Sequence, residues 1–344
     1  MAENVGFVYD PIFLEHETGA HPENPDRMRA TMALLEESGL LSRLAGIDAR
    51  DATPADLALV HDPRYVEAVH RAALEGGGWA DPDTLITPRS YDVAIRVVGG
   101  TLAAVDAVVA GEVASAFCLV RPPGHHASSA QAMGFCLFNH VAVAAAYARE
   151  RHGIERVAIV DYDVHHGNGT QDAFYADPGV LYVSTHEFPF YPGTGRADEI
   201  GAREGRGFNV NIPMPHRSGD AHYRRAFEEV VVPVLRRYQP QLILVSAGYD
   251  AHFADDIAGQ QLSVDGYGAL VSMVMAAAGE LCGGRVVAAL EGGYHLVALP
   301  WCVRRTIEVM RGDAPTPDAL GTIPPREPIG FDAMLAEAKA LHGL

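Results

Sequence analysis

DYDVHHGN, at residues 161–168, directly follows the apolar run 156–160, which predicts a buried strand of a parallel sheet. Alternate residues of a strand share a face, so Asp161, Asp163 and His165 are expected to point the same way as the chain leaves the sheet. Ligands of open α/β sheets bind outside the carboxyl ends of the strands. Two carboxylates and an imidazole at such an end therefore predict a metal site.

Two structural interpretations of this stretch compete with a metal site. A calcium loop that began at Asp161 needs glycine at its sixth position, where His166 stands. Asp163 or Asn168 could instead cap a helix. A cap, however, leaves the other polar clusters of the chain unexplained.

Three further apolar runs end in residues of catalytic type. RPPGHH, at 121–126, follows the run 116–120, and its prolines and glycine release the two histidines from any strand ladder. The run 241–246 leads to Asp250, and the run 285–290 leads to EGGY at 291–294. Four strands that each finish in this way indicate one shared active site rather than four separate structural roles.

The motifs resemble those of a known enzyme superfamily. RPPGHH, GFCLFN at 134–139, DYDVHHGNGTQD at 161–172, SAGYD at 246–250 and EGGY follow one another as in zinc-dependent deacetylases. The superfamily comprises the histone deacetylases, the acetylpolyamine amidohydrolases and the acetoin-utilisation proteins. The resemblance runs from HPENPDR at 21–27 to Tyr294, which is most of the chain. It implies the arginase/deacetylase fold and hydrolysis of a linear amide bond.

The resemblance also implies a metal and its ligands. Zn²⁺ would be held by Asp163, His165 and Asp250. Three protein ligands leave an open position, which is typical of a catalytic rather than a structural site. Iron(II) suits the same ligands.

The implied catalytic residues surround that metal. His126 would act as general base and then as general acid. His125, oriented by Asp161, would help to hold developing charge, and Tyr294 would donate a hydrogen bond to the oxyanion. Asn168 would orient His126; many histone deacetylases carry aspartate there, whereas class II deacetylases and acetylpolyamine enzymes share the asparagine.

Family members bind potassium as well, and the resemblance places two sites here. The first site would use Asp161, Asp163, the His165 carbonyl, the Ser184 hydroxyl and the Thr185 carbonyl. The second site would use the carbonyls of Phe174, Asp177, Val180 and Phe208.

Substrate contacts follow from the same comparison. Phe135, preceded by Gly134, and Tyr191 would form the two aromatic walls of a narrow tunnel for a thin aliphatic chain. Gly293 would lie beside the substrate, and Ile257 near the pocket mouth, where polyamine-selective eukaryotic relatives carry glutamate. We therefore expect acetyl-lysine in peptides or proteins as the substrate, with acetylated polyamines as the alternative.

Several charged residues keep two interpretations. Arg27 aligns with an arginine that lines an internal cavity behind the metal in the family, but it could equally be a buried ion-pair partner. Acidic loop residues could supply charge at the pocket rim or simply be solvated; these are Asp81, Asp83, Asp255 and Asp256.

The 344 residues alternate between apolar strands and helical stretches, which predicts a parallel sheet covered on both faces. With the resemblance, this becomes a three-layer α/β/α sandwich with a mainly parallel eight-stranded sheet. The expected helices are 92–109, 141–151, 221–238 and 266–281. We expect a catalytic domain at 1–311 and a proline-rich segment at 312–344 that ends in a short helix at 331–341. That segment would pack on the domain or join the subunits of a homo-oligomer.

Composition excludes some classes of function. The formal net charge of −18, without a basic run, argues against nucleic-acid binding and is compatible with cationic partners. The four cysteines show no CxxC spacing, so a disulfide framework is not expected. We find no signal-peptide pattern and no long apolar span, so we expect a cytoplasmic protein without a membrane partner.

Two rival functions share the fold or the site. An arginase-like enzyme with two manganese ions needs carboxylates where His252 and Gly167 stand, so one metal is expected. A non-catalytic reader of acetyl-lysine is expected to have lost the tyrosine or a metal ligand, and this chain keeps Tyr294 and all three ligands.

Overall fold

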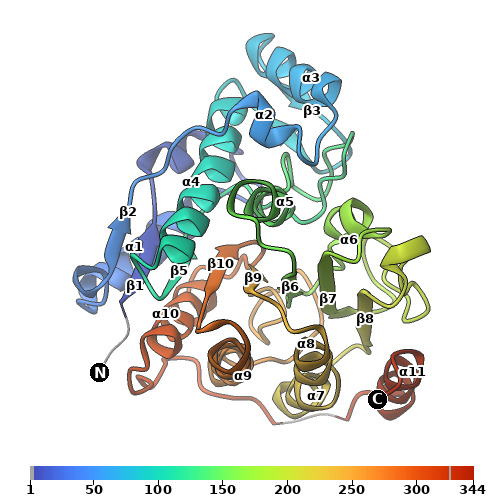
Figure 1. Ribbon diagram of the computed structural model, residues 1–344. Helices are drawn as coiled ribbons and strands as arrows, with labels where there is room; N and C mark the ends of the chain where they lie inside the picture. The colour runs from blue at the N-terminus through green and yellow to red at the C-terminus, as the bar shows by residue number, and fades with distance from the viewer. Residues whose placement is uncertain (1–3, 325–326) are drawn as a thin grey trace.

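The computed structural model describes residues 4–324 and 327–344. Residues 1–3 of the predicted domain and residues 325–326 of the predicted proline-rich segment lie outside the described residues. The fold is the predicted three-layer α/β/α sandwich around an eight-stranded sheet (Figure 1). All pairs of neighbouring strands in this sheet are parallel. In sheet order the strands are β2 (Ala45–Ile47), β1 (Val5–Val8), β5 (Ser115–Cys118), β10 (Val286–Leu290), β9 (Leu242–Ala247), β6 (Val157–Asp161), β7 (Val180–Glu187) and β8 (Asn209–Met214).

Helices cover both faces of the sheet (Figure 1). Successive residues of each buried strand point to opposite sides, so both faces of the sheet are apolar and each packs against a layer of helices. On β6, Val157 and Ile159 face one layer, while Ala158 and Val160 face the other. The first layer is built on α4 (Ser90–Ala110) and α5 (His140–His152). The second contains α1 (Asp26–Glu37), α7 (Asp220–Ala226), α8 (Val232–Tyr238), α9 (Val264–Cys282) and α10 (Ala298–Arg311).

The sheet order explains why the polar clusters meet. The four strands whose ends carry the motifs are β5, β10, β9 and β6, and they are contiguous in the sheet. Their carboxyl ends therefore share one stretch of one sheet edge. Each of the four predicted runs coincides with its strand to within one or two residues.

The predicted helical stretch 221–238 is confirmed, but it is not one regular α-helix. The stretch 221–238 consists of α7, a turn of π-helix at Phe227–Val231, and α8. Pro233 has no N–H group, so a continuous α-helix would lack one of its backbone hydrogen bonds there. The π-helical turn Phe227–Val231 lies directly before this position, and its hydrogen bonds span five residues instead of four.

The prediction that the chain contains no long apolar span is wrong. Among the described residues, α4 is long and apolar enough to cross a membrane by length and composition. About two thirds of its apolar window is buried inside the protein, where α4 packs on α5 and on β1, β5 and β10. It is therefore a helix of the core.

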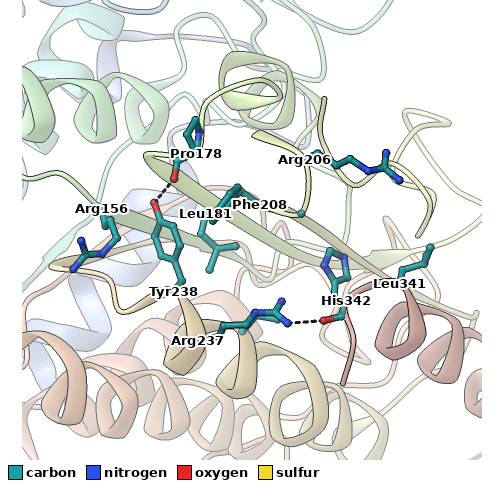
Figure 2. Close-up of a pocket in the computed structure, with 11 residues that line it drawn as sticks. Arg156, Pro178, Leu181, Arg206, Phe208, Arg237, Tyr238, Leu341 and His342 are labelled. Atoms are coloured by element: carbon teal, nitrogen blue, oxygen red, sulfur yellow. Dashed lines mark hydrogen bonds between the residues drawn. The ribbon is translucent and has the colours of Figure 1, made fainter. Parts of the chain in front are cut away.

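The C-terminal helix α11 (Phe331–Leu341) has the predicted bounds and packs on the edge strand β8. Phe331, Leu335 and Ala338 are its buried residues. Beyond the helix, the carbonyl oxygen of His342 accepts a hydrogen bond from Arg237 of α8 at 2.5 Å (Figure 2). A pocket of about 530 Å³ lies between this tail, α8 and the start of β7 (Figure 2), and none of the residues that line it belongs to the motifs.

Candidate metal centre and catalytic site

Asp163, His165 and Asp250 form a compact group of buried ligand-type side chains at the carboxyl ends of β6 and β9. Their donor atoms all lie within 4.8 Å of one another. His165 Nδ1 is 3.1 Å from Asp163 Oδ1 and 3.2 Å from Asp250 Oδ2. The carboxylate of Asp161 lies beside this group and faces Tyr182 and His125 instead. The period-two argument from the sequence holds only as far as Asp161, because β6 ends there.

The surroundings of these carboxylates favour a cation. Backbone N–H groups orient them: Gly292 donates to Asp163 at 2.8 Å and Val164 donates to Asp250 at 2.9 Å. The other oxygen of Asp250 is buried and lies 3.2 Å from His165 Nδ1, but it makes no hydrogen bond of good geometry. Burial, together with the negative charge of Asp163, raises the pKa of Asp250 to about 6. A buried carboxylate oxygen that makes no well-formed hydrogen bond, and that faces a second carboxylate and an imidazole, fits a divalent metal such as zinc.

Gly292 makes this close approach possible. A Cβ atom at position 292 would overlap the carboxylate of Asp250 and would also crowd that of Asp163. Any larger residue would push the loop after β10 away from the ligands.

Two histidines, each paired with a polar side chain, lie next to the group of Asp163, His165 and Asp250. His126 Nδ1 is 2.8 Å from the side-chain oxygen of Asn168, so Nδ1 carries the proton and Nε2 is left as an acceptor when the ring is neutral. His125 Nδ1 is 3.1 Å from Asp161 Oδ2. The two rings are 4.1 Å apart.

Electrostatics give the two histidines opposite protonation states. Burial holds the pKa of His126 well below its usual value, and the positive charges of His125 and His165 lower it further. Burial also opposes charge on His125, but Asp163 and Asp161 outweigh it and raise the pKa to about 10. His126 is therefore the neutral member of the pair, which is the state a general base needs.

The predicted aromatic residues lie around this group. The ring of Tyr191 meets His126 edge to face at 5.1 Å, and its hydroxyl oxygen is buried without a hydrogen-bond partner. Phe135 lies 5.7 Å from the ring of Tyr294. Gly134 packs directly against His126, whose ring a Cβ atom at position 134 would overlap, and its φ of 56° also favours glycine.

Arg27 contacts the ring of Tyr294 and the backbone beside it. The guanidinium of Arg27 lies 4.8 Å from the centre of the tyrosine ring and donates to the carbonyl oxygen of Gly293 at 2.7 Å. Burial raises the pKa of Tyr294 well above its usual value, so the phenol keeps its proton. Arg27 is itself fully buried and paired with Glu23 at 3.1 Å. Of the two interpretations of Arg27, the structure shows the buried ion pair.

Glu23 links Arg27 to Arg121, which begins the loop that carries His125 and His126, and sequence reasoning missed this role. Its carboxylate accepts hydrogen bonds from both Arg27 and Arg121, the latter through two nitrogens at 2.8 Å each. Burial opposes its charge, but Arg121 and Arg27 outweigh it and lower the pKa of Glu23 to about 2. The i, i+4 spacing of Glu23 and Arg27 was a signal for half of this network; Arg121 is too distant in sequence to give one.

Glu291 was also missed as an individual residue. Its buried carboxylate accepts hydrogen bonds from the backbone N–H groups of Gly124 and His125 and from the Ser246 hydroxyl. It therefore fixes the histidine loop to the ends of β9 and β10.

The interpretation that Asp255 supplies charge at the rim of the pocket is wrong. Its carboxylate is buried and accepts the backbone N–H groups of Tyr294, His295 and Ile257. It therefore positions the tyrosine loop. Asp256, the next residue, is exposed, while Asp81 and Asp83 are half-buried.

The predicted potassium ligands lie as follows. Asp161 and Ser184 are direct neighbours in the register of β6 and β7, and Ser184 Oγ is 2.8 Å from His186 Nδ1. In the second group, the carbonyls of Phe174 and Phe208 accept the N–H groups of Asp177 and Tyr182. Val180 begins β7. A carbonyl oxygen has two lone pairs, so these hydrogen bonds leave capacity for an ion.

Comparison with known proteins places this arrangement in context. A histone deacetylase domain profile matches residues 21–310. The histone deacetylase-like amidohydrolase of Pseudomonas aeruginosa is 41% identical over 333 residues, which cover 91% of this chain and 87% of that protein. The human polyamine deacetylase HDAC10 is 39% identical, with 88% of this chain and 46% of that protein covered. The crystal structure of the HDA15 HD domain matches with a TM-score of 0.91 and 35% identity, covering 99% of this chain and 94% of that one.

Proposed function

Because the chain belongs to the histone deacetylase family and is a hydrolase acting on amides, we propose that it removes acetyl groups from ε-acetyl-lysine in peptides or proteins. The observation that carries this proposal is the buried group of Asp163, His165 and Asp250 beside a neutral His126. Deacetylation of acetylated polyamines is the alternative, favoured by the similarity to a human polyamine deacetylase.

The metal of the proposed enzyme is zinc, with iron(II) as the other candidate, and Asp163, His165 and Asp250 would hold it. A metal ion there would supply Lewis-acid chemistry, polarising a carbonyl and lowering the pKa of water from about 15.7 to about 7. A second buried group of ligand-type side chains, His125, Cys136 and Glu291, lies at the same strand ends. His125 there faces Asp161, and Glu291 accepts the backbone N–H groups of Gly124 and His125, so we propose one metal per subunit, at Asp163, His165 and Asp250.

The protein side chains would divide the proton transfers among them. Nε2 of His126 takes a proton from the attacking water, and the same nitrogen later returns it to the leaving amine. His125, charged and paired with Asp161, lies close enough to favour negative charge on the tetrahedral intermediate. The protonated hydroxyl of Tyr294 donates a hydrogen bond to that oxyanion.

Phe135 and Tyr191 would enclose the aliphatic stem of the substrate, with Gly134 and Gly293 contributing backbone beside it. The half-buried Ile257 offers no charge to read a polyamine cation, which supports acetyl-lysine over acetylpolyamine. We retain the two potassium sites in the proposal. A cytoplasmic location and a homo-oligomeric state stay predictions.

We expect the zinc-loaded protein to turn over an acetyl-lysine peptide with a kcat/KM at least ~100 times that for an acetylated polyamine. That ratio corresponds to about 2.7 kcal/mol of transition-state preference. Parallel measurements with both substrates test it. The reverse ratio would make the polyamine the substrate, and turnover of neither would refute deacetylation.

We expect Asn168→Asp to move the acid limb of the pH profile of kcat/KM upward by ~1 unit. A carboxylate 2.8 Å from His126 Nδ1 stabilises the imidazolium, so the base is lost to protonation at a higher pH than in the parent protein. Asn4→Asp, at an exposed position, serves as the control. An unshifted acid limb would show that His126 is not the group that titrates.

A further inference from the structure

Trp79 is an exposed aromatic residue beside the proposed site. It lies on β3 (Gly78–Trp79) of a small hairpin and is 62% exposed. Its ring centre is 6.4 Å from that of His21, and His21 meets Phe135 edge to face at 4.5 Å. Phe135 in turn lies 5.7 Å from Tyr294. A line of rings thus leads from the proposed oxyanion donor outward to Trp79.

Hydrogen bonds fix this hairpin to the wall of the site. Trp79 pairs with Leu85 of β4 (Leu85–Ile86), and Ala80 donates to the carbonyl of Thr84 at 2.8 Å. The hydroxyl of Thr84 accepts the backbone N–H of Phe135 at 3.0 Å. The indole therefore has a defined position relative to Phe135, and most of its surface is open to a partner.

The charge around the indole selects the kind of partner. His21 Nε2 lies 3.1 Å from the carbonyl oxygen of Asp83, so that residue is next to the His21 ring as well. One carboxylate oxygen of Asp81 accepts the N–H groups of Asp83 and Thr84, which places both acids on the hairpin turn. No arginine of the described part of the chain lies over the Trp79 ring. An open indole face beside carboxylates favours a cation.

On the basis of the proposed deacetylase activity, we infer that Trp79 is a specificity-determining residue. Its indole binds a cationic side chain, lysine or arginine, that neighbours the acetyl-lysine of a substrate peptide. Asp81 and Asp83 set the sign of the charge that is preferred. The acetyl-lysine stem enters between Phe135 and Tyr191, so the adjacent residue is the part of the peptide left at the hairpin.

The test compares peptides that differ only beside the acetyl-lysine, where they carry arginine, alanine or glutamate. We expect Trp79→Ala to lower kcat/KM for the arginine peptide ~fivefold relative to the alanine peptide. Turnover of an acetyl-lysine amide without neighbouring residues stays within about twofold, since no cation reaches the indole. Leu74→Ala, which truncates an apolar side chain that is 75% exposed, is the matched control.

Equal losses on all three peptides, or no loss on the arginine peptide, would overturn the inference. An equal loss on acetylspermidine would also overturn it, because the cation would then belong to the acetylated molecule itself. If the parent protein hydrolyses none of the acetyl-lysine substrates, the proposed function fails instead. The two failures are therefore separate outcomes of one set of measurements.

Fluorescence offers a readout that needs no turnover. The chain has two tryptophans, so Trp301→Phe leaves Trp79 as the sole indole. We expect titration with the arginine peptide to change its emission at concentrations where the glutamate peptide has no effect. Emission that responds equally to both peptides would contradict a cation-specific contact.

Discussion

The Asp250→Asn variant is expected to lose at least ~10³-fold in kcat/KM and to retain no stoichiometric metal. Asp250 contributes a buried oxygen that makes no well-formed hydrogen bond and lies 3.2 Å from His165 Nδ1, and its other oxygen is already held by the Val164 N–H group. An amide removes the negative charge that balances a divalent ion. If the metal supplies about 4 kcal/mol of transition-state stabilisation, its loss accounts for a factor near 10³.

Stability gives a second readout of the same change. A ligand at ~1,000 times its Kd stabilises the folded state by about 4 kcal/mol, so zinc should raise the Tm of the parent protein and a chelator should reverse the rise. Asp250→Asn should show no such dependence. Asp256→Asn, an exposed neighbour, is the control and should behave like the parent. A zinc-dependent Tm that survives in Asp250→Asn would place the metal elsewhere.

The fold was predictable where strands are buried on both faces. The runs that became β5, β6, β9 and β10 are mostly apolar because helices cover both sides of the sheet, and composition gives their bounds to within one or two residues. β8 could not be found in this way. It contains two asparagines and Pro213, which a strand tolerates at the edge of a sheet, where it has one neighbour.

In the candidate site too, the sequence predicted some residues and missed others. The motif residues were nameable because they follow strands and match a family pattern. The residues that orient them were not, since their contacts are long-range and depend on packing. Glu23 pairs with Arg121, which is 98 positions away in the chain. In the sequence Asp255 looks like an ordinary acidic loop residue, and only the structure shows that it accepts three backbone N–H groups. Burial decides whether an aspartate anchors a loop or is solvated, and local sequence does not report it.

The position of Trp79 could not be predicted from the sequence either. Two-residue strands such as β3 and β4 are too short for any periodicity to appear in the sequence. Its place beside His21 and Phe135 arises only from the folded hairpin. Residues that tune specificity at a rim are therefore harder to predict than residues that perform the chemistry.

Tyr294→Phe is expected to lower kcat by ~10²–10³, the usual effect of deleting one oxyanion donor. KM should change less than threefold, because the hydroxyl contacts an oxygen whose charge develops only in the transition state. Metal content and Tm should match the parent, since the ring keeps its contacts with Arg27 and Phe135. Steady-state kinetics on the acetyl-lysine peptide, with metal analysis of the same samples, measure all three quantities.

The loop around Tyr294 makes this substitution informative. Asp255 and Arg27 hold its backbone through the N–H of Tyr294 and the carbonyl of Gly293, so removing the hydroxyl leaves the loop anchored. Tyr91→Phe, on α4, controls for loss of a tyrosine hydroxyl elsewhere in the fold. A fall in kcat with a parallel rise in KM would mean that the hydroxyl binds the ground-state carbonyl. An unchanged kcat would leave His125 as the main protein group that stabilises the oxyanion, because its imidazolium lies beside the proposed metal ligand Asp163 and is paired with Asp161.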